Sequence, residues 1–170
     1  MKILISGMTQ SQPSHSAWFA EAMKRILLLL ATAATLFTGQ SNADAVSDWN
    51  ATAVSVQLRI PNPNRGALQD LAYLHIAIYD AVNAIDGRYK VFAVDPPNKV
   101  PWASLEAAVH SAARRILMTL YPADSIYIES FYNSRISPLP NDSAKTKGIE
   151  IGNTTASMFL ALRNGDGREA

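Results

Sequence analysis

Hydrophobic residues recur with a helical period between positions 71 and 85 of the chain. Large aliphatic side chains follow one another at spacings of three or four residues, which places them on one stripe of an α-helix. A polar and aromatic stripe lies beside the first, and alanines fill much of the remaining surface. The aliphatic stripe consists of Leu71, Leu74, Ile78, Val82 and Ile85, and the second stripe of His75, Tyr79 and Asn83.

Small side chains let neighbouring helices approach closely, so this segment is expected to have neighbours on several sides. We therefore predict that it is the central helix of a bundle. It is expected to begin near Arg65, after the prolines of 61–64, because proline cannot continue a helix. Asp86 is expected to end it, with Gly87 as a left-handed cap.

Four further helices are predicted from similar patterns. The first covers residues 46–60, with Asp48 as its cap and Trp49 on its buried face. The second starts at the N-cap Ser104, the third has Pro122 in its first turn, and the fourth is capped within 141–143. The buried stripe expected on the first of these three helices is Leu105, Val109, Ala112, Ile116 and Leu120. Ile128, Phe131 and Arg135 share one face of the next helix. In the last helix, Ala144, Gly148, Ile151, Thr155, Met158 and Leu162 follow an alternating spacing of four and three residues.

Two glycines, Gly148 and Gly152, stand one helical turn apart in the last of these helices. Glycine lowers intrinsic helicity, so a pair at this spacing indicates a close contact with another helix. The segment 88–100 is expected to be a non-helical connection, with a short extended piece around Val91 and Phe92. These features predict an all-α fold, a helical bundle with short joints rich in proline and glycine.

Composition agrees with a folded domain and excludes some functions. The chain has 170 residues, of which 48% are hydrophobic and 17% charged. A real core is therefore feasible. The formal net charge of +1 gives no electrostatic case for nucleic acid as a partner. The chain has no cysteine, which excludes disulfides, thiolate metal sites and cysteine nucleophiles.

The N-terminal region has the pattern of a secretory signal. Met23 is followed by two basic residues, an apolar run up to Phe37, and the small-x-small sequence Ala43-Asp-Ala45. We expect 1–22 to be an over-extended start, 23–45 a signal peptide, and 46–167 the helical bundle of a secreted or periplasmic protein. The apolar run is too short to span a bilayer comfortably. No stable membrane span is expected in the chain that remains after signal cleavage. An uncleaved anchor or a buried helix is the alternative.

Few residues of the predicted bundle can do nucleophilic or metal chemistry. His75 and His110 are its only histidines, and each lies within a predicted helix. We interpret His75 as a residue at the core edge bonded to a neighbouring helix, and His110 as structural or at the surface. Asp80 is a poor partner for His75, because five residues along a helix turn the side chain by roughly 140 degrees. Tyr79 and Asn83 are expected to make hydrogen bonds between helices.

Two further patterns carry little chemistry on their own. The spacing of Asp80 and Asp86 is not one that favours a metal ion. Arg114 and Arg115 can contact an anion, although basic residues in the C-terminal half of a helix are typically solvated partners of the helix dipole. The residues thus indicate no catalytic, cofactor-binding or metal site in this chain.

Several phrases of the sequence resemble one family. The most specific is Leu74-His-Ile-Ala-Ile-Tyr-Asp-Ala-Val-Asn-Ala-Ile85. The resemblance is to the N-terminal half of bacterial vanadium-dependent haloperoxidase-like proteins, within the type 2 phosphatidic acid phosphatase superfamily. It covers most of residues 45–167. The supporting phrases are Ala45-Val-Ser-Asp-Trp-Asn-Ala51, Ser104-Leu-Glu-Ala-Ala-Val109, Leu120-Tyr-Pro-Ala123, Lys145-Thr-Lys-Gly-Ile-Glu-Ile-Gly152 and Leu162-Arg-Asn-Gly-Asp-Gly167.

The resemblance implies an all-helical exported protein whose complete form binds vanadate, or phosphate in the phosphatases. In that family the anion is held by three motifs, Lys-x6-Arg-Pro, Pro-Ser-Gly-His and Ser-Arg-x5-His-x3-Asp. None of them occurs here: Arg-Pro is absent, Pro13-Ser-His15 lacks the glycine, and Ser134-Arg135 is followed by Asn141 where histidine is required. No catalytic residue can therefore be carried over, and no cofactor is expected in this chain.

Two hypotheses follow. In the first, the chain is the N-terminal scaffold fragment of a haloperoxidase- or acid phosphatase-like protein, inactive alone, whose partner is a missing C-terminal catalytic half. In the second, it is a free-standing exported helical module that binds or supports a partner without catalysis. A homo-oligomer is compatible with either.

Overall fold

The computed structural model describes residues 23–24, 42–60, 66–97 and 99–167. The chain divides into two compact units, Met1–Gln40 and Ser41–Ala170. In the first unit only Met23 and Lys24, which are helical, are described. The predicted start at 1–22, most of the predicted signal peptide and the helix stop at 61–64 lie outside the described residues.

The described part of the second unit is all-α, as predicted. Its helices are α2 (Asn42–Gln57), α3 (Ala67–Asp86), α4 (Leu105–Leu120), α5 (Ser125–Ile136) and α6 (Ser143–Leu162), with a short 3-10 turn η1 (Pro122–Asp124) before α5. Within the described residues, no helix is both long and apolar enough to span a membrane.

The first helix differs from its prediction at both ends. It begins at Asn42, so Asp48 lies inside α2 instead of capping it. The carboxylate of Asp48 instead forms an ion pair with Arg135 of α5, with Oδ2 and Nη2 2.7 Å apart. The helix ends at Gln57, and Ile60 lies in the turn that follows. The predicted cleavage point after Ala45 therefore falls within α2.

The boundaries of α3 and the caps of α4 and α6 agree with the sequence. Gly87 closes α3 in the left-handed conformation, with φ of 68°. The hydroxyl of Ser104 accepts a hydrogen bond from the backbone N–H of Ala107, and the carboxylate of Asp142 accepts one from Lys145. Each cap satisfies a backbone N–H that the first helical turn leaves unpaired.

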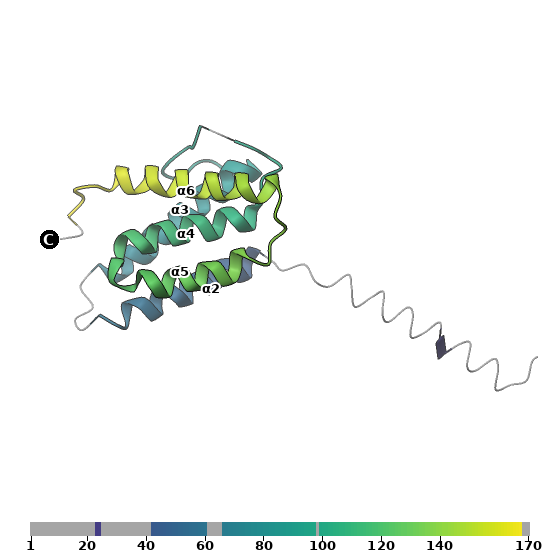
Figure 1. Cartoon of the computed structure of the whole chain (residues 1–170). Helices are drawn as coiled ribbons and strands as arrows, with labels where there is room; N and C mark the ends of the chain where they lie inside the picture. The colour runs from purple at the N-terminus through teal and green to yellow at the C-terminus, as the bar shows by residue number, and fades with distance from the viewer. Residues whose placement is uncertain (1–22, 25–41, 61–65, 98, 168–170) are drawn as a thin grey trace, which may run out of the picture. The chain divides into compact units, whose positions relative to one another are not determined.

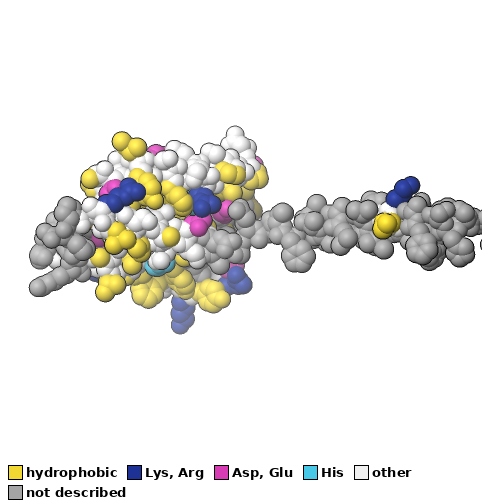
Figure 2. Space-filling view, turned by 90° about the horizontal axis from the view of Figure 1, so that it is seen from below, with side chains coloured by type: hydrophobic (Ala, Val, Ile, Leu, Met, Phe, Trp, Pro, Cys, Tyr) yellow, Lys and Arg dark blue, Asp and Glu magenta, His cyan; other side chains and the backbone are white. Residues whose placement is uncertain are grey.

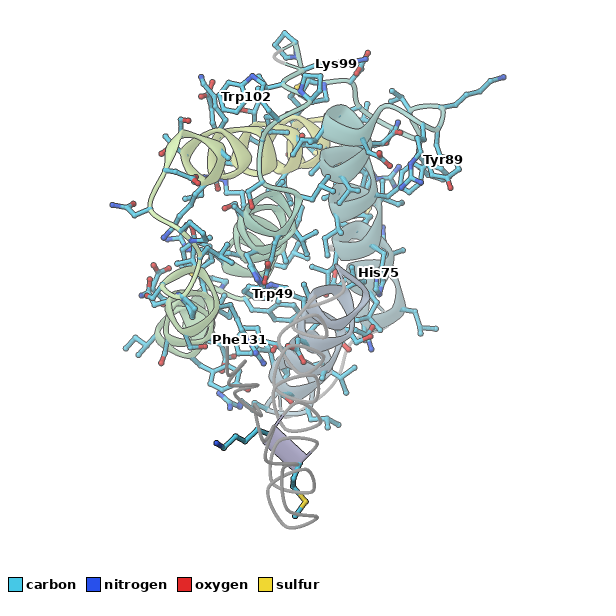
Figure 3. All side chains as sticks on the ribbon, turned by 90° about the vertical axis from the view of Figure 1, so that its right-hand side faces the viewer. Trp49, His75, Tyr89, Lys99, Trp102 and Phe131 are labelled. Carbon is cyan, nitrogen blue, oxygen red and sulfur yellow. The ribbon has the colours of Figure 1, made fainter. Side chains whose placement is uncertain are left out.

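The central helix of the bundle is α4, so the assignment of that place to α3 is wrong. α4 contacts α2, α3, α5 and α6, and Figure 3 shows it surrounded by them. Its residues 107–113 are all buried. Because most of these side chains are small, helices can pack on every side of α4. The amphipathic stripe that made α3 conspicuous marks a helix on the outside of the bundle.

The close contact predicted from the two glycines of α6 is confirmed. A Cβ atom on Gly148 would meet the carbonyl oxygen of Ser104, and one on Gly152 would meet that of Ala108. Backbone thus packs on backbone between α6 and α4. The buried stripe of α6 is shifted from the predicted one, because Leu162 is exposed while Gly152, Ala156 and Phe159 are buried.

Aromatic side chains fill the space around α4. Trp49 of α2 is fully buried and meets Phe131 of α5 edge to face, with ring centroids 4.8 Å apart. Tyr73 of α3 meets Phe159 of α6 in the same way, at 5.3 Å. Such edge-to-face pairs stabilise packing beyond the area that they bury.

Candidate functional site

Three side chains of α3 hold the segment that follows it, residues 88–94, in place. The buried carboxylate of Asp80 accepts hydrogen bonds from the backbone N–H groups of Phe92, Ala93 and Val94, at 2.8, 2.8 and 2.9 Å. Hydrogen bonds between a carboxylate and backbone N–H groups are charge-assisted and therefore stronger than neutral ones. Asp80 replaces the partners that these N–H groups would have in regular secondary structure.

Asn83 and Tyr79 complete the attachment. The side-chain amide of Asn83 donates to the carbonyl oxygen of Tyr89 and accepts from its N–H, at 2.7 and 2.9 Å. The hydroxyl of Tyr79 donates to the carbonyl of Lys90 at 3.0 Å. The prediction that Tyr79 and Asn83 bond between helices is therefore wrong: they bond to the connection, where backbone groups need partners. The expected extended piece is a series of bends.

The held segment exposes its side chains. Tyr89 is 64% exposed and Phe92 71% exposed, and Arg88, Lys90 and Val91 are exposed as well. Six hydrogen bonds from α3 fix the backbone while these side chains face solvent. An ordered backbone with exposed aromatic residues is a feature of surfaces that contact another molecule.

A groove of about 360 Å³ lies along α3, between α2 and the segment 88–94. We call it the α3 groove. Aliphatic side chains from three helices line the α3 groove. Polar side chains lie near its two ends, His75 at one end and Asp86 with Arg88 at the other. Figure 3 shows His75 and Tyr89 on the same side of α3. The lining residues are Val46, His75, Ile78, Tyr79, Val82, Asn83, Asp86, Arg88, Tyr89 and Val109.

His75 bonds to a neighbouring helix, as predicted, and its side chain is exposed. Its Nε2 forms a hydrogen bond with Oδ1 of Asn50 in the neighbouring helix α2, at 3.1 Å. Asp80 is engaged with the segment 88–94, so the two side chains do not act as a pair. The geometry assigns His75 to the joint between α2 and α3.

His110 is deeply buried, with 1% of its surface exposed, so of the two predicted places, structural or at the surface, the surface is excluded. The indole N–H of Trp49 donates to its Nδ1 at 2.8 Å, which leaves the proton of the neutral ring on Nε2. Glu106 Oε1 lies 3.7 Å from Nε2, beyond hydrogen-bond distance. Burial, and then the positive charge of Arg135, lower the pKa of His110 to about 4, against the opposing effect of Asp48. The ring is therefore neutral at pH 7.

Most of the arginines that the structure describes in the bundle pair with separate carboxylates. Arg114 bonds to Glu129 of α5 and lies over the ring of Tyr132, while Arg115 beside it is exposed. On the face seen in Figure 2, basic side chains lie beside acidic ones. The remaining pairs are Arg59–Asp124, Arg88–Asp86, Arg135–Asp48 and Arg163–Asp166. In the part of the chain that the structure describes, no three histidines or carboxylates come together to hold a metal ion.

Sequence reasoning missed the role of Asp80 and of a second buried acid, Asp70. The hydroxyl of Tyr121, which follows α4, donates to Asp70 Oδ2 at 2.5 Å. Both acids lie within an otherwise apolar helix, and that was the available signal: a buried carboxylate requires hydrogen-bond donors. The donors lie 12 to 51 residues away, so the sequence alone did not identify them.

Comparison with known proteins adds no assignment: no family model, no curated protein and no solved structure matches this chain.

Proposed function

We propose that this chain is the helical scaffold portion of a secreted or periplasmic vanadium-dependent haloperoxidase-like or acid phosphatase-like protein, and that it has no catalysis of its own. Its partner is a catalytic portion that carries the vanadate- or phosphate-binding motifs. The resemblance of the sequence is the starting point of the proposal, and the roles of the resembling residues support it.

One observation carries the proposal. The polar and glycine residues within the resembling phrases make the contacts that hold the bundle together. Tyr79, Asp80 and Asn83 attach the segment 88–94 to α3. Trp49 bonds to His110 across the core, and Gly148 allows α6 to approach α4. The residues that resemble the family are therefore ones with structural roles in the bundle, which supports the interpretation of this chain as a scaffold.

The electrostatics agree with a chain that lacks its own oxyanion site. Binding vanadate, or stabilising a phosphoryl-transfer transition state, takes several cationic donors that converge on one anion. Here Arg88, Arg114 and Arg135 each pair with a carboxylate at a different place in the bundle. The ring of His110 is buried and neutral, so it is not available to bond to an anion.

Calorimetric titration with orthovanadate, together with a bromination assay using a phenolic dye and hydrogen peroxide, tests the proposal. We expect neither stoichiometric binding nor dye bromination. Vanadate binding at one site per chain that is lost in His75→Ala or His110→Ala would overturn the proposal. It would move those residues from scaffold to active site.

The alternative function is a free-standing exported helical module that binds a partner. The exposed aromatic residues of the segment 88–94 favour it. Sequencing the DNA downstream of codon 170 separates the two functions. The three anion-binding motifs there support the scaffold proposal, and a stop followed by unrelated sequence supports the free-standing module.

A further inference from the structure

We propose that the α3 groove binds a small uncharged amphiphile, a medium-length alkyl chain that ends in a hydroxyl group. This inference does not depend on the proposed scaffold function, because it rests on the groove alone. The volume of about 360 Å³ lies within the range of small-molecule sites, which are mostly apolar with a few polar groups that fix orientation.

The shape of the groove favours a chain. Its lining residues on α3 run from His75 to Asp86, eleven positions apart, which is about 16 Å at the rise of an α-helix. Ile78 and Val82 lie between these ends, and Val46 and Val109 line the groove from α2 and α4. An aliphatic lining along this length fits an extended alkyl chain, such as an octyl chain, better than a compact ring.

The polar side chains along the groove are already engaged. The hydroxyl of Tyr79 and the amide of Asn83 bond to the backbone of the segment 88–94. Nε2 of His75 bonds to Asn50. These residues therefore contribute mainly carbon surface to a ligand. The same hydrogen bonds fix the position of Tyr89, so this wall of the groove is formed before a ligand arrives, which lowers the ordering cost of binding.

The charges at one end of the groove select the head group. Arg88 Nε lies 2.5 Å from Asp86 Oδ2, and the Arg88 side chain is 72% exposed. A guanidinium has five N–H donors and a carboxylate has several lone pairs, so both retain capacity beyond this pair. A hydroxyl can accept from Arg88 and donate to Asp86 without separating them. A carboxylate head would compete with Asp86 for Arg88 and would repel it.

The test is calorimetric titration of the full-length chain with octan-1-ol, hexan-1-ol and octanoate. Octan-1-ol is expected to bind at one site, about tenfold more tightly than hexan-1-ol because it buries two more methylene groups. Octanoate is expected to bind about tenfold more weakly than octan-1-ol. In Asp86→Asn the difference between octanoate and octan-1-ol should disappear. Tighter binding of octanoate than of octan-1-ol to the parent protein would overturn the assignment of the head group.

Two variants locate the site. Val82→Trp fills the groove and should abolish octan-1-ol binding, whereas Leu71→Trp is the matched control, because Leu71 is half-buried on the same helix and does not line the groove. Circular dichroism checks that both variants fold. If Val82→Trp does not fold, Tyr89→Ala takes its place, since the Tyr89 side chain is exposed and only its backbone bonds to Asn83. Unchanged octan-1-ol affinity in the folded groove variant would overturn the proposal.

Discussion

Because the ring of His110 is buried and neutral, the free energy of unfolding of this protein is expected to decrease as the pH falls. His110 has a pKa of about 4 in the folded protein, against an ordinary pKa of 6.5 for histidine. Three charged groups lie near it on three elements: Glu106 on α4, Asp48 on α2 and Arg135 on α5. Protonation would place a positive charge in the core, where the positive charge of Arg135 would repel it. The folded state therefore binds the proton only at a lower pH than the unfolded chain does.

The sign and size of the effect follow from linkage. Above pH 6.5 the ring is neutral in both states and the full stability is present. As the pH falls from 6.5 toward 4, the unfolded chain binds the proton first, so the free energy of unfolding decreases. A pKa difference of this size is on the order of 3 kcal/mol in total, of which about 2 kcal/mol is lost between pH 7.5 and pH 5.0. Below pH 4 both states are protonated and this contribution stops changing.

Urea denaturation at pH 7.5 and 5.0, followed by circular dichroism, measures the effect. In His110→Gln, whose amide oxygen can accept the hydrogen bond from Trp49, the loss between the two pH values is expected to be smaller than in the parent by about 2 kcal/mol. His75→Gln, which replaces the other histidine of the described bundle, is measured beside it as the matched variant. Equal pH dependence in His110→Gln and the parent would refute the assignment of the titration to His110.

Three further substitutions test the packing of the bundle. Gly152→Ala should destabilise the bundle by about 1–3 kcal/mol, because the added methyl group meets the backbone of Ala108. Helix propensity alone predicts the opposite, a stabilisation of about 1 kcal/mol. The sign of the change in the free energy of unfolding, measured by urea denaturation, shows which of the two effects is larger. Asp80→Ala should lower the free energy of unfolding by about 2–3 kcal/mol, and the N–H of Phe92 should lose protection from hydrogen exchange. Unchanged exchange at this N–H would contradict the attachment of the segment 88–94 by Asp80. Ile78→Asp should bury an unpaired charge and lower the melting temperature sharply, and an unaltered melting temperature would disprove the burial of this face.

Local sequence signals were sufficient for the helices and for several of their ends, although not for the ends of α2. The helical spacing around Leu74 and Ile78, the cap at Ser104 and the left-handed Gly87 act within one or two turns, so they can be found along the chain. The glycines of α6 also carried correct information about packing, because glycine is unfavourable in a helix interior unless something needs its space. The engagement of His75 with a neighbouring helix could be inferred from its place beside an aliphatic stripe.

The arrangement of the helices and the partners of the buried polar groups were decided only by the tertiary structure. An amphipathic stripe shows that one side of a helix is buried, but it does not show how many helices pack against it. The small side chains at 107–113 let α2, α3, α5 and α6 all contact α4, and the stripe predicted along α4 did not reveal this, so α3 was mistaken for the centre. The local sequence around Asp80 does not identify the three N–H groups that it binds, because they belong to a segment whose path depends on the whole bundle. The α3 groove combines α2, α3, α4 and the segment 88–94. Such a site exists only where elements meet, so the residues of any one element could not predict it.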